Sequence, residues 1–321
     1  MLGTRRGNRV RILILGGTGL TGPYAVRRLH ELGHEVTVFH RGQHEVQLPA
    51  GVRDVRGDFA HPPSEVLHSE PDVVVHMWAM TESDARTFLE AFRGVAGRAV
   101  VISSGDVYRA YGCLQRLETG PPALIPLAED APLRESRYPY RKMAPNQDHW
   151  MTVYDKILVE RALLEQSELP ATILRFPAVC GPGEYRRFRQ WLQPMLRGDA
   201  ELRVQVDWSE WRWTHGFVDD VAEAVVLAAT RARDGSRVYN VGELRTATMR
   251  ERLEAFAEAA GWRGQIIPVA AAELPESARM PHHFSHHLVY DTSRIRAELG
   301  YEEVVPPEEA LSRMLAWERA D

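Results

Sequence analysis

Apolar residues occur in short continuous runs along the first half of the chain, separated by stretches with helical spacing. Many runs are rich in valine and isoleucine, such as VVV at 73–75 and VVI at 100–102. Runs of this kind are typical of strands covered on both faces. The predicted strands are 10–15, 35–40, 52–56, 72–77, 99–103 and 171–175, and the predicted helices are 20–32, 84–92 and 154–166. Alternating strands and helices predict an α/β fold with a parallel sheet.

The alternation stops between residues 109 and 150, where six prolines stand and helical periodicity is weak. A long loop is predicted there, and loops of that length are usually functional. Beyond residue 183 arginine and tryptophan become frequent, and then a further helix (219–232) and strand (237–241) are predicted.

The composition is that of a globular protein. The 321 residues are 44% hydrophobic and 26% charged, with a formal net charge of −5, which excludes disordered and fibrous classes. No apolar run approaches the roughly 18 residues of a membrane span, and no secretory pattern is visible. Cys113 and Cys180 are too few for a disulfide framework. We therefore expect a cytoplasmic protein with no membrane partner, and the charge gives no reason to expect nucleic acid.

Lysine is rare in this chain. Of 39 basic residues, only Lys142 and Lys156 are lysines and 37 are arginines. A coding bias towards arginine explains the excess. Under such a bias, a retained lysine is a candidate for a position that needs a compact ammonium group.

A glycine-rich segment, GGTGLTG at 16–22, follows the first predicted strand and opens a helix. It fits both G-x-G-x-x-G, from Gly17, and G-x-x-G-x-x-G, from Gly16. In this setting glycines permit a tight turn and a close approach of backbone to a pyrophosphate, which the helix N-terminus then faces. The segment predicts a dinucleotide site; a glycine turn that merely packs is the alternative.

The second predicted strand ends in VFHRG at 38–42, without the acid that would hold the ribose hydroxyls of NAD. Arg41 suits a 2′-phosphate instead, so the sequence favours NADP, with NAD as the alternative. Asp58, after the third strand, is a candidate acceptor for the adenine amino group.

Eight segments, in order, resemble the extended short-chain dehydrogenase/reductase family of NAD(P)-dependent epimerases, dehydratases and reductases. They include GxxGxxG at 16–22, DVVVHMWA at 72–79, ISSGDVY at 102–108, LRFPAVCGP at 174–182 and GFVDDVA at 216–222. The resemblance implies a doubly wound Rossmann sheet over residues 1–180, to which 214–243 return, and a smaller intertwined substrate lobe made mainly by 181–321. It also implies a homodimer built through helices 84–92 and 154–166.

The cofactor contacts that we expect from the glycine segment, the strand ends and this resemblance are Gly16, Thr18, Gly19, Leu20, Gly22, Arg41, Asp58, Phe59, Met77, Trp78, Ser103, Lys156 and Phe176.

Members of this family use a tyrosine as acid or base, a lysine that lowers its pKa, and a serine or threonine that hydrogen-bonds the reacting oxygen. Counting back from Tyr108 assigns the serine to Ser104, and Lys156 fits the family helix. Tyrosine and lysine are normally spaced Y-x-x-x-K, because positions i and i+4 share a helical face. Here Thr152 stands at the tyrosine position.

Three interpretations of the displaced tyrosine remain open. In the first, Tyr154 acts because the helix begins late or carries a bulge; on a regular helix it would lie about 200° from Lys156. In the second, a loop supplies Tyr108, Tyr138 or Tyr140, although the literal Y-x-x-x-K at 138–142 contains a proline that disfavours a helix. In the third, the oxidoreductase step is lost. Our candidate catalytic residues are Ser104, Tyr154 and Lys156.

The substrate side departs from the sugar-nucleotide members of the family. Trp213 stands where they place a diphosphate-binding arginine, and Ala178 stands where asparagine is common. Arginines nearby either bind an anionic substrate or form a solvated face: Arg186, Arg187, Arg189 and Arg212. Tryptophans alternate along a predicted strand, for core packing or as a stacking platform: Trp208, Trp211 and Trp213.

Four histidines gather at 282–287, where a helix would pair His282 with His286. No acid follows at zinc-site spacing, so we predict no metal site, and a pH-sensitive loop is an alternative role. The predicted function is an NAD(P)-dependent oxidoreductase, epimerase or dehydratase-like enzyme for a small hydroxylated, sugar-like or anionic substrate. The alternative is a dinucleotide-binding regulator without turnover, or an RNA-binding protein, against which the net charge argues.

Overall fold

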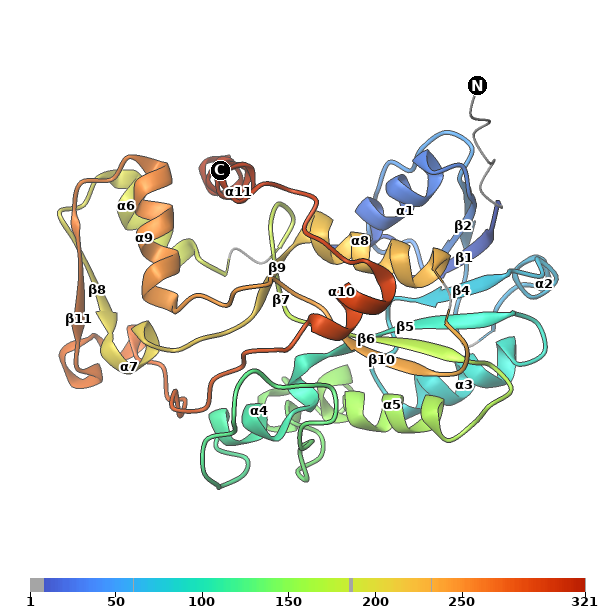
Figure 1. Ribbon diagram of the computed structural model, residues 1–321, viewed down its shortest axis with the longest axis horizontal. Coiled ribbons are helices and arrows are strands. Elements are labelled where there is room, and N and C mark those ends of the chain that lie inside the picture. The colour runs from blue at the N-terminus through green and yellow to red at the C-terminus, as the bar shows by residue number, and fades with distance from the viewer. Residues whose placement is uncertain (1–8, 60, 185–186, 232, 321) are drawn as a thin grey trace. The chain divides into compact units, whose positions relative to one another are not determined.

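The buried, β-branched runs form the central sheet of the computed structural model, which describes residues 9–59, 61–184, 187–231 and 233–320 (Figure 1). Seven strands are ordered β10-β6-β5-β4-β1-β2-β3. They are β1 (Arg11–Leu15), β2 (Glu35–His40), β3 (Arg53–Arg56), β4 (Val73–His76), β5 (Arg98–Ser104), β6 (Ala171–Phe176) and β10 (Arg237–Asn240). β1 pairs in parallel with both β2 and β4, so the strand order reverses at β1. Such a switch point is where doubly wound sheets bind ligands.

Helices cover both faces of this sheet, as the predicted doubly wound fold requires (Figure 1). Helices α1 (Gly22–Glu31) and α8 (Val218–Thr230) lie on one face, and α3 (Glu82–Phe92) and α5 (Lys156–Leu164) lie on the other. Because successive strand residues point to opposite faces, Leu13 and Leu15 pack with α3 and α5. The same core cluster takes in Phe88 of α3 and Leu163 of α5.

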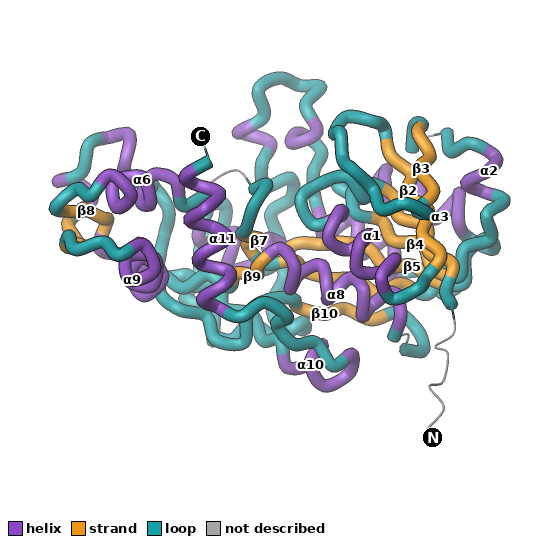
Figure 2. Tube along the Cα trace, turned by 90° about the horizontal axis from the view of Figure 1, so that it is seen from above, coloured by secondary structure: helices purple, strands orange, loops and turns teal. Residues whose placement is uncertain are grey.

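The remaining elements are shorter sheets and helices (Figure 2). β7 (Ala178–Cys180) pairs in parallel with β9 (His215–Phe217), and β8 (Glu201–Gln205) pairs in parallel with β11 (Gln265–Val269). The helices are α2 (Ser64–Leu67), α4 (Arg109–Leu114), α6 (Arg189–Arg197), α7 (Val206–Ser209), α9 (Met249–Ala260), α10 (Ser293–Leu299) and α11 (Pro307–Arg319). Short 3₁₀ turns cover Gly105–Val107, Arg141–Met143, Trp150–Thr152, Ala271–Glu273 and Glu276–Ala278.

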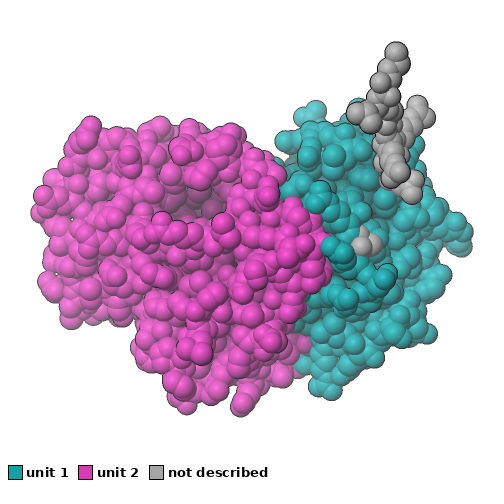
Figure 3. All heavy atoms as spheres, viewed as in Figure 1, with its two compact units in different colours: residues 1–103, 158–174, 222–238 teal, residues 104–157, 175–221, 239–321 magenta. Residues whose placement is uncertain are grey.

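The chain divides into two compact units (Figure 3). Unit 1 comprises Met1–Ser103, Leu158–Leu174 and Ala222–Val238, and unit 2 comprises Ser104–Ile157, Arg175–Val221 and Tyr239–Asp321. Both units are therefore built from three separate stretches of chain. The functional division near residue 180 that the resemblance implies stays a prediction.

Several local predictions were wrong. The segment 109–150 is not a plain loop, because it begins with helix α4 and contains a 3₁₀ turn. The predicted tryptophan strand is absent from 208–213, since Trp208 lies in helix α7 and only isolated bridges follow. Helix α8 ends at Thr230, and the last residue predicted for it lies outside the described residues.

Two expectations concern metals and membranes. Histidines 282–287 form no helix, and in the described part of the chain no three His, Cys, Asp or Glu side chains are grouped to hold a metal ion. Among the described helices, none combines the length and apolarity needed to cross a membrane.

Candidate active site

The loop between β1 and α1 has the geometry of a phosphate-binding turn. Gly16 has a φ of 86°, in the left-handed region that glycine tolerates. A Cβ on Gly22 would lie 2.4 Å from the carbonyl carbon and oxygen of Gly17, so only glycine fits at the start of α1. Around Gly19 no atom lies within 4 Å of such a Cβ, which leaves this side of the turn open. The cradle fits the close approach of a pyrophosphate to backbone.

A cavity of about 210 Å³ lies within unit 1 and is lined by four predicted cofactor contacts: Arg41, Asp58, Phe59 and Trp78. The guanidinium carbon of Arg41 is 5.7 Å from the ring centroids of both Phe59 and Trp78. Met77 lies next to the loop, since a Cβ on Gly16 would be 3.6 Å from that of Met77. A cation, a carboxylate and two aromatic rings therefore line one cavity.

The two serines at the end of β5 have different partners. The hydroxyl of Ser103 donates to Glu160 Oε1 at 2.5 Å, and both side chains are buried. Ser104 Oγ accepts a hydrogen bond from the backbone N–H of Asp106 at 3.2 Å and so caps the 3₁₀ turn that follows. Ser103 thus joins β5 to α5, and Ser104 lines the cavity in unit 2.

Helix α5 begins late, at Lys156. Asp155 Oδ1 accepts the backbone N–H of Ile157 at 3.0 Å, so the carboxylate satisfies a donor of the first helical turn. Thr152, at the family's tyrosine position, lies in a 3₁₀ turn, and its hydroxyl donates to the carbonyl of His149 at 2.8 Å. Tyr154 therefore precedes the helix, and the angular spacing of a helix does not apply to it.

Ser104, Tyr154 and Lys156 lie together. Tyr154 is buried, with its ring centroid 5.8 Å from Lys156 Nζ. Burial holds the pKa of Tyr154 well above its ordinary value, and the adjacent Asp106 raises this pKa further, while a hydrogen bond with Ser104 lowers it. The geometry matches the interpretation in which a late helix start brings Tyr154 to the site.

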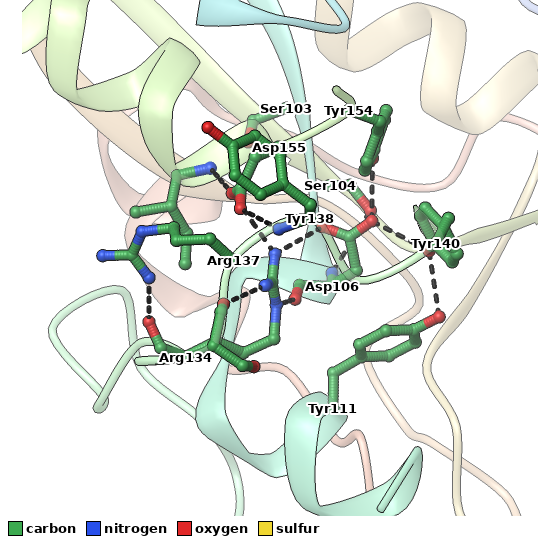
Figure 4. Close-up of polar contacts among 12 residues, drawn as sticks. Ser103, Ser104, Asp106, Tyr111, Arg134, Arg137, Tyr138, Tyr140, Tyr154 and Asp155 are labelled. Carbon is green, nitrogen blue, oxygen red and sulfur yellow. Dashed lines mark hydrogen bonds and ion pairs between the residues drawn. The ribbon is translucent and has the colours of Figure 1, made fainter. Parts of the chain in front are cut away.

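A carboxylate and two further tyrosines join this group, and the sequence reasoning missed the carboxylate (Figure 4). Asp106 Oδ2 accepts hydrogen bonds from Tyr154 Oη at 2.7 Å and from Tyr140 Oη at 3.0 Å. Tyr140 Oη accepts in turn from Tyr111 Oη at 2.9 Å. The available signal was an acid two residues after Ser104, inside the segment ISSGDVY.

The other sequence candidates lie elsewhere. Tyr108 Oη donates to Asn240 Oδ1 at 2.6 Å and accepts from Arg175 at 3.0 Å, and burial raises its pKa to about 12. Tyr138 has the Arg141 guanidinium 4.0 Å from its ring centroid. Lys142 is exposed in a 3₁₀ turn, so the literal Y-x-x-x-K forms no helical pair.

A second cavity, of about 480 Å³, lies within unit 2. Ser104, Asp106 and Tyr140 line it together with Phe176 and an aromatic wall of Trp191, Trp208, Trp211 and Trp213. The rings of Trp191 and Trp208 stack with centroids 4.2 Å apart. The polar groups of the site thus open onto a pocket with aromatic walls.

Of the candidate arginines, Arg187 lines this cavity, with its guanidinium 4.9 Å from the Trp213 ring centroid. Arg212 is exposed and Arg189 begins α6. Arg186 lies outside the described residues.

Comparisons with known proteins identify the family of this chain. Residues 12–242 match the NAD dependent epimerase/dehydratase family. The chain is 29% identical to 2′-dehydrokanamycin reductase from Streptomyces kanamyceticus over 235 residues, which are 70% of this chain and 60% of that protein. It is 25% identical to UDP-glucose 4-epimerase from Corynebacterium glutamicum over 91% of this chain and 90% of that one.

Among solved structures, MoeE5 in complex with UDP-glucuronic acid and NAD has the same fold. Its TM-score is 0.69 at 23% identity, over 96% of this chain and 99% of that chain.

Proposed function

We propose a reaction for this chain, which belongs to the NAD dependent epimerase/dehydratase family: oxidation or reduction at a hydroxyl-bearing carbon of a small hydroxylated substrate, with NADP preferred over NAD. The family and the similar reductase and epimerase support an enzyme that uses a nicotinamide dinucleotide. The observation that carries the proposal is the grouping of Tyr154 and Lys156 with Ser104, which lines an aromatic pocket.

The cofactor would be held by the glycine loop and by the cavity around Arg41. The open backbone at Gly19 would receive the pyrophosphate, Arg41 the 2′-phosphate of NADP, and Asp58 the adenine amino group. When bound, the nicotinamide supplies the acceptor or donor of the hydride. The preference for NADP depends on Arg41, whose guanidinium lies over the rings of Phe59 and Trp78.

In unit 2, Ser104 would hydrogen-bond the reacting oxygen of the substrate, and Tyr154 would exchange its proton with that oxygen. Lys156 is buried and lies next to the Tyr154 ring. Its ammonium group therefore favours negative charge on the Tyr154 oxygen. Lys156 would also hold the nicotinamide ribose, the role that its counterpart has in the family.

The pocket supports a substrate with an apolar face. Four tryptophans line it, and the C–H face of a sugar-like ring stacks well on such side chains. Asp106, Ser104 and Tyr140 offer partners to hydroxyl groups, while Arg187 offers one cation to an anionic substituent. This combination favours a hydroxylated ring with few charges.

The test is nicotinamide oxidation and reduction across a panel of sugars, amino sugars and ketones. Lys156→Ala and Tyr154→Phe should each lower kcat about 10²–10⁴-fold, the usual contribution of a positioned acid or base. Lys142→Ala is a matched control, since that lysine is exposed and should leave turnover unchanged. Equal activity of Lys156→Ala and wild type would contradict the proposal. Cofactor binding without turnover of any substrate would instead favour a regulator.

A further inference from the structure

Asp106 occupies an unusual position for an acid. It follows β5 in a 3₁₀ turn, only 4% of its surface is exposed, and two phenols donate to one oxygen of its carboxylate (Figure 4). Both phenols come from the segment 138–157, which Asp155 fixes by accepting the backbone N–H of Tyr138 at 2.8 Å. The carboxylate is therefore part of a preformed arrangement.

The other oxygen, Asp106 Oδ1, is buried and has no hydrogen-bond partner within the described residues. Arg134 Nη2 lies 4.0 Å from it, at the limit of an ion pair, and hydrogen-bonds Asp155 at 3.4 Å instead. Since Asp106 lines the unit 2 cavity, its carboxyl group borders the space where the substrate would lie. The titratable groups that act on Asp106 or feel its charge are Tyr111, Arg134, Tyr140, Tyr154, Lys156 and Tyr290.

The pair Tyr154 and Asp106 cannot both carry negative charge at low cost. Their oxygens are 2.7 Å apart in a buried site, where like charges repel strongly. Burial and Asp106 hold the pKa of Tyr154 well above its ordinary value, so this side chain stays a neutral phenol and cannot accept a proton unless it gives up its own. Burial also raises the pKa of Asp106, which makes the carboxylate a better proton acceptor than an exposed aspartate.

We infer that Asp106 is the proton acceptor of this active site and that Tyr154 relays protons to it. During oxidation of an alcohol, the substrate O–H bond breaks and its proton goes to Tyr154 Oη. At the same time the proton of Tyr154 passes to Asp106 Oδ2, so the phenol stays neutral and Asp106 becomes a carboxylic acid. The nicotinamide of the proposed function, when bound, would accept the hydride. Reduction runs the same proton transfers in reverse.

Tyr140 and Tyr111 complete the route. Tyr140 donates to the same Asp106 oxygen, and Tyr111 donates to Tyr140, while both line the cavity. Once Asp106 is protonated, this chain of hydroxyl groups can return the proton to the pocket.

The first test needs neither cofactor nor substrate, so its outcome is separate from that of the proposed function on which the inference rests. The protein is titrated with base while the ultraviolet absorption of phenolate is followed. Asp106→Asn should lower the pH at which Tyr154 ionises by about 1–3 units, because it removes an adjacent charge. The change should vanish in the double variant with Tyr154→Phe. Asp130→Asn, at an exposed position, is the matched control. An unchanged phenol titration in Asp106→Asn would overturn the inference.

A second variant covers the case in which Asp106→Asn does not fold. Tyr154→Phe removes a hydrogen bond that lowers the pKa of Asp106. The infrared C=O band of a protonated, buried carboxyl should therefore persist to higher pH than in the wild type. A band with the same pH dependence in both proteins would contradict the relay.

In the active enzyme, the pH profile of kcat/KM for alcohol oxidation gives the third readout. The wild type should show an acidic limb from the Asp106 carboxyl, and Asp106→Asn should lose that limb and become active only at higher pH. Asp106→Glu should restore part of the limb. Turnover with an unaltered profile in Asp106→Asn would leave the proposed function standing and refute the relay.

Discussion

Removal of the Arg134 guanidinium should destabilise the protein, because this group lies buried among the residues of the site. Its side chain is fully buried and donates to the backbone carbonyls of Asp106 and Ser136 as well as to the Asp155 carboxylate. Arg134→Met keeps the aliphatic bulk and removes the charge and the donors. Two buried carboxylates, those of Asp106 and Asp155, then lose the cation that lies 4.0 Å and 3.4 Å from them. Breaking a buried ion pair by removing one partner costs about 3–5 kcal/mol, so we expect a loss of that size in the free energy of unfolding.

The loss should depend on pH, and its sign follows from Asp106. Burial raises the pKa of this carboxyl and the charge of Arg134 lowers it. Without the guanidinium the folded variant binds a proton at higher pH than the wild type, whereas the unfolded chain behaves alike in both. Uptake of this proton relieves the buried charge, so the deficit in unfolding free energy should be smaller at acidic pH than at alkaline pH.

Urea-induced unfolding of both proteins at several pH values measures the effect. Arg137→Met is the control, because Arg137 is exposed and donates to the backbone carbonyls of Arg134 and Glu135, and it should change stability by roughly 0.5 kcal/mol or less. A loss below about 1 kcal/mol in Arg134→Met, or a loss that does not vary with pH, would refute the reasoning from buried charge.

Three further changes test the cofactor loop and the pH dependence of stability. Gly22→Ala places a methyl 2.4 Å from the Gly17 carbonyl, so cofactor binding should weaken at least about tenfold in calorimetric titration; unchanged affinity would show that the loop yields. Arg41→Ala should weaken NADP binding about tenfold or more and leave NAD binding unchanged, and an equal effect on both would remove the proposed 2′-phosphate contact. Burial raises the pKa of Asp220 to about 6, so the wild type should lose unfolding free energy as the pH rises from about 4 to 6. Asp220→Asn should abolish that portion of the pH dependence, as measured by urea unfolding.

The strands of the sheet were predictable because the signal for each one lies within its own short stretch of sequence. Continuous β-branched runs identify strands buried on both faces, and the glycine loop follows the first of them, as the fold shows. The need for glycine in this loop was also predictable from the spacing. The tight turn brings Gly22 so close to the Gly17 carbonyl that a Cβ would not fit. The cavity beside Arg41 could be anticipated from strand ends alone, because parallel strands finish at one edge.

The candidate site in unit 2 depends on contacts between residues far apart in the chain. The spacing of apolar residues in helices and strands does not predict such contacts. Asp106 bonds phenols 34 and 48 residues away in the chain. The tryptophans line a pocket although they form no continuous strand, because helix α7 and isolated bridges bring them there. Period-2 spacing describes a face only where the backbone is extended, and it fails when a helix interrupts it.

The displaced tyrosine follows from the place where helix α5 begins. A Y-x-x-x-K pair depends on four residues of regular helix, and here the helix begins at the lysine itself. Asp155 ends the preceding irregular segment, because one of its oxygens binds the N–H of Ile157 and the other binds the N–H of Tyr138. That single carboxylate therefore fixes both the helix start and the loop that carries Tyr140. Since Tyr154 directly precedes Asp155, the residue that shortens the helix also sets the direction from which the phenol meets Asp106. A sequence motif defined by helical spacing cannot detect this arrangement, whereas the start of the helix explains it.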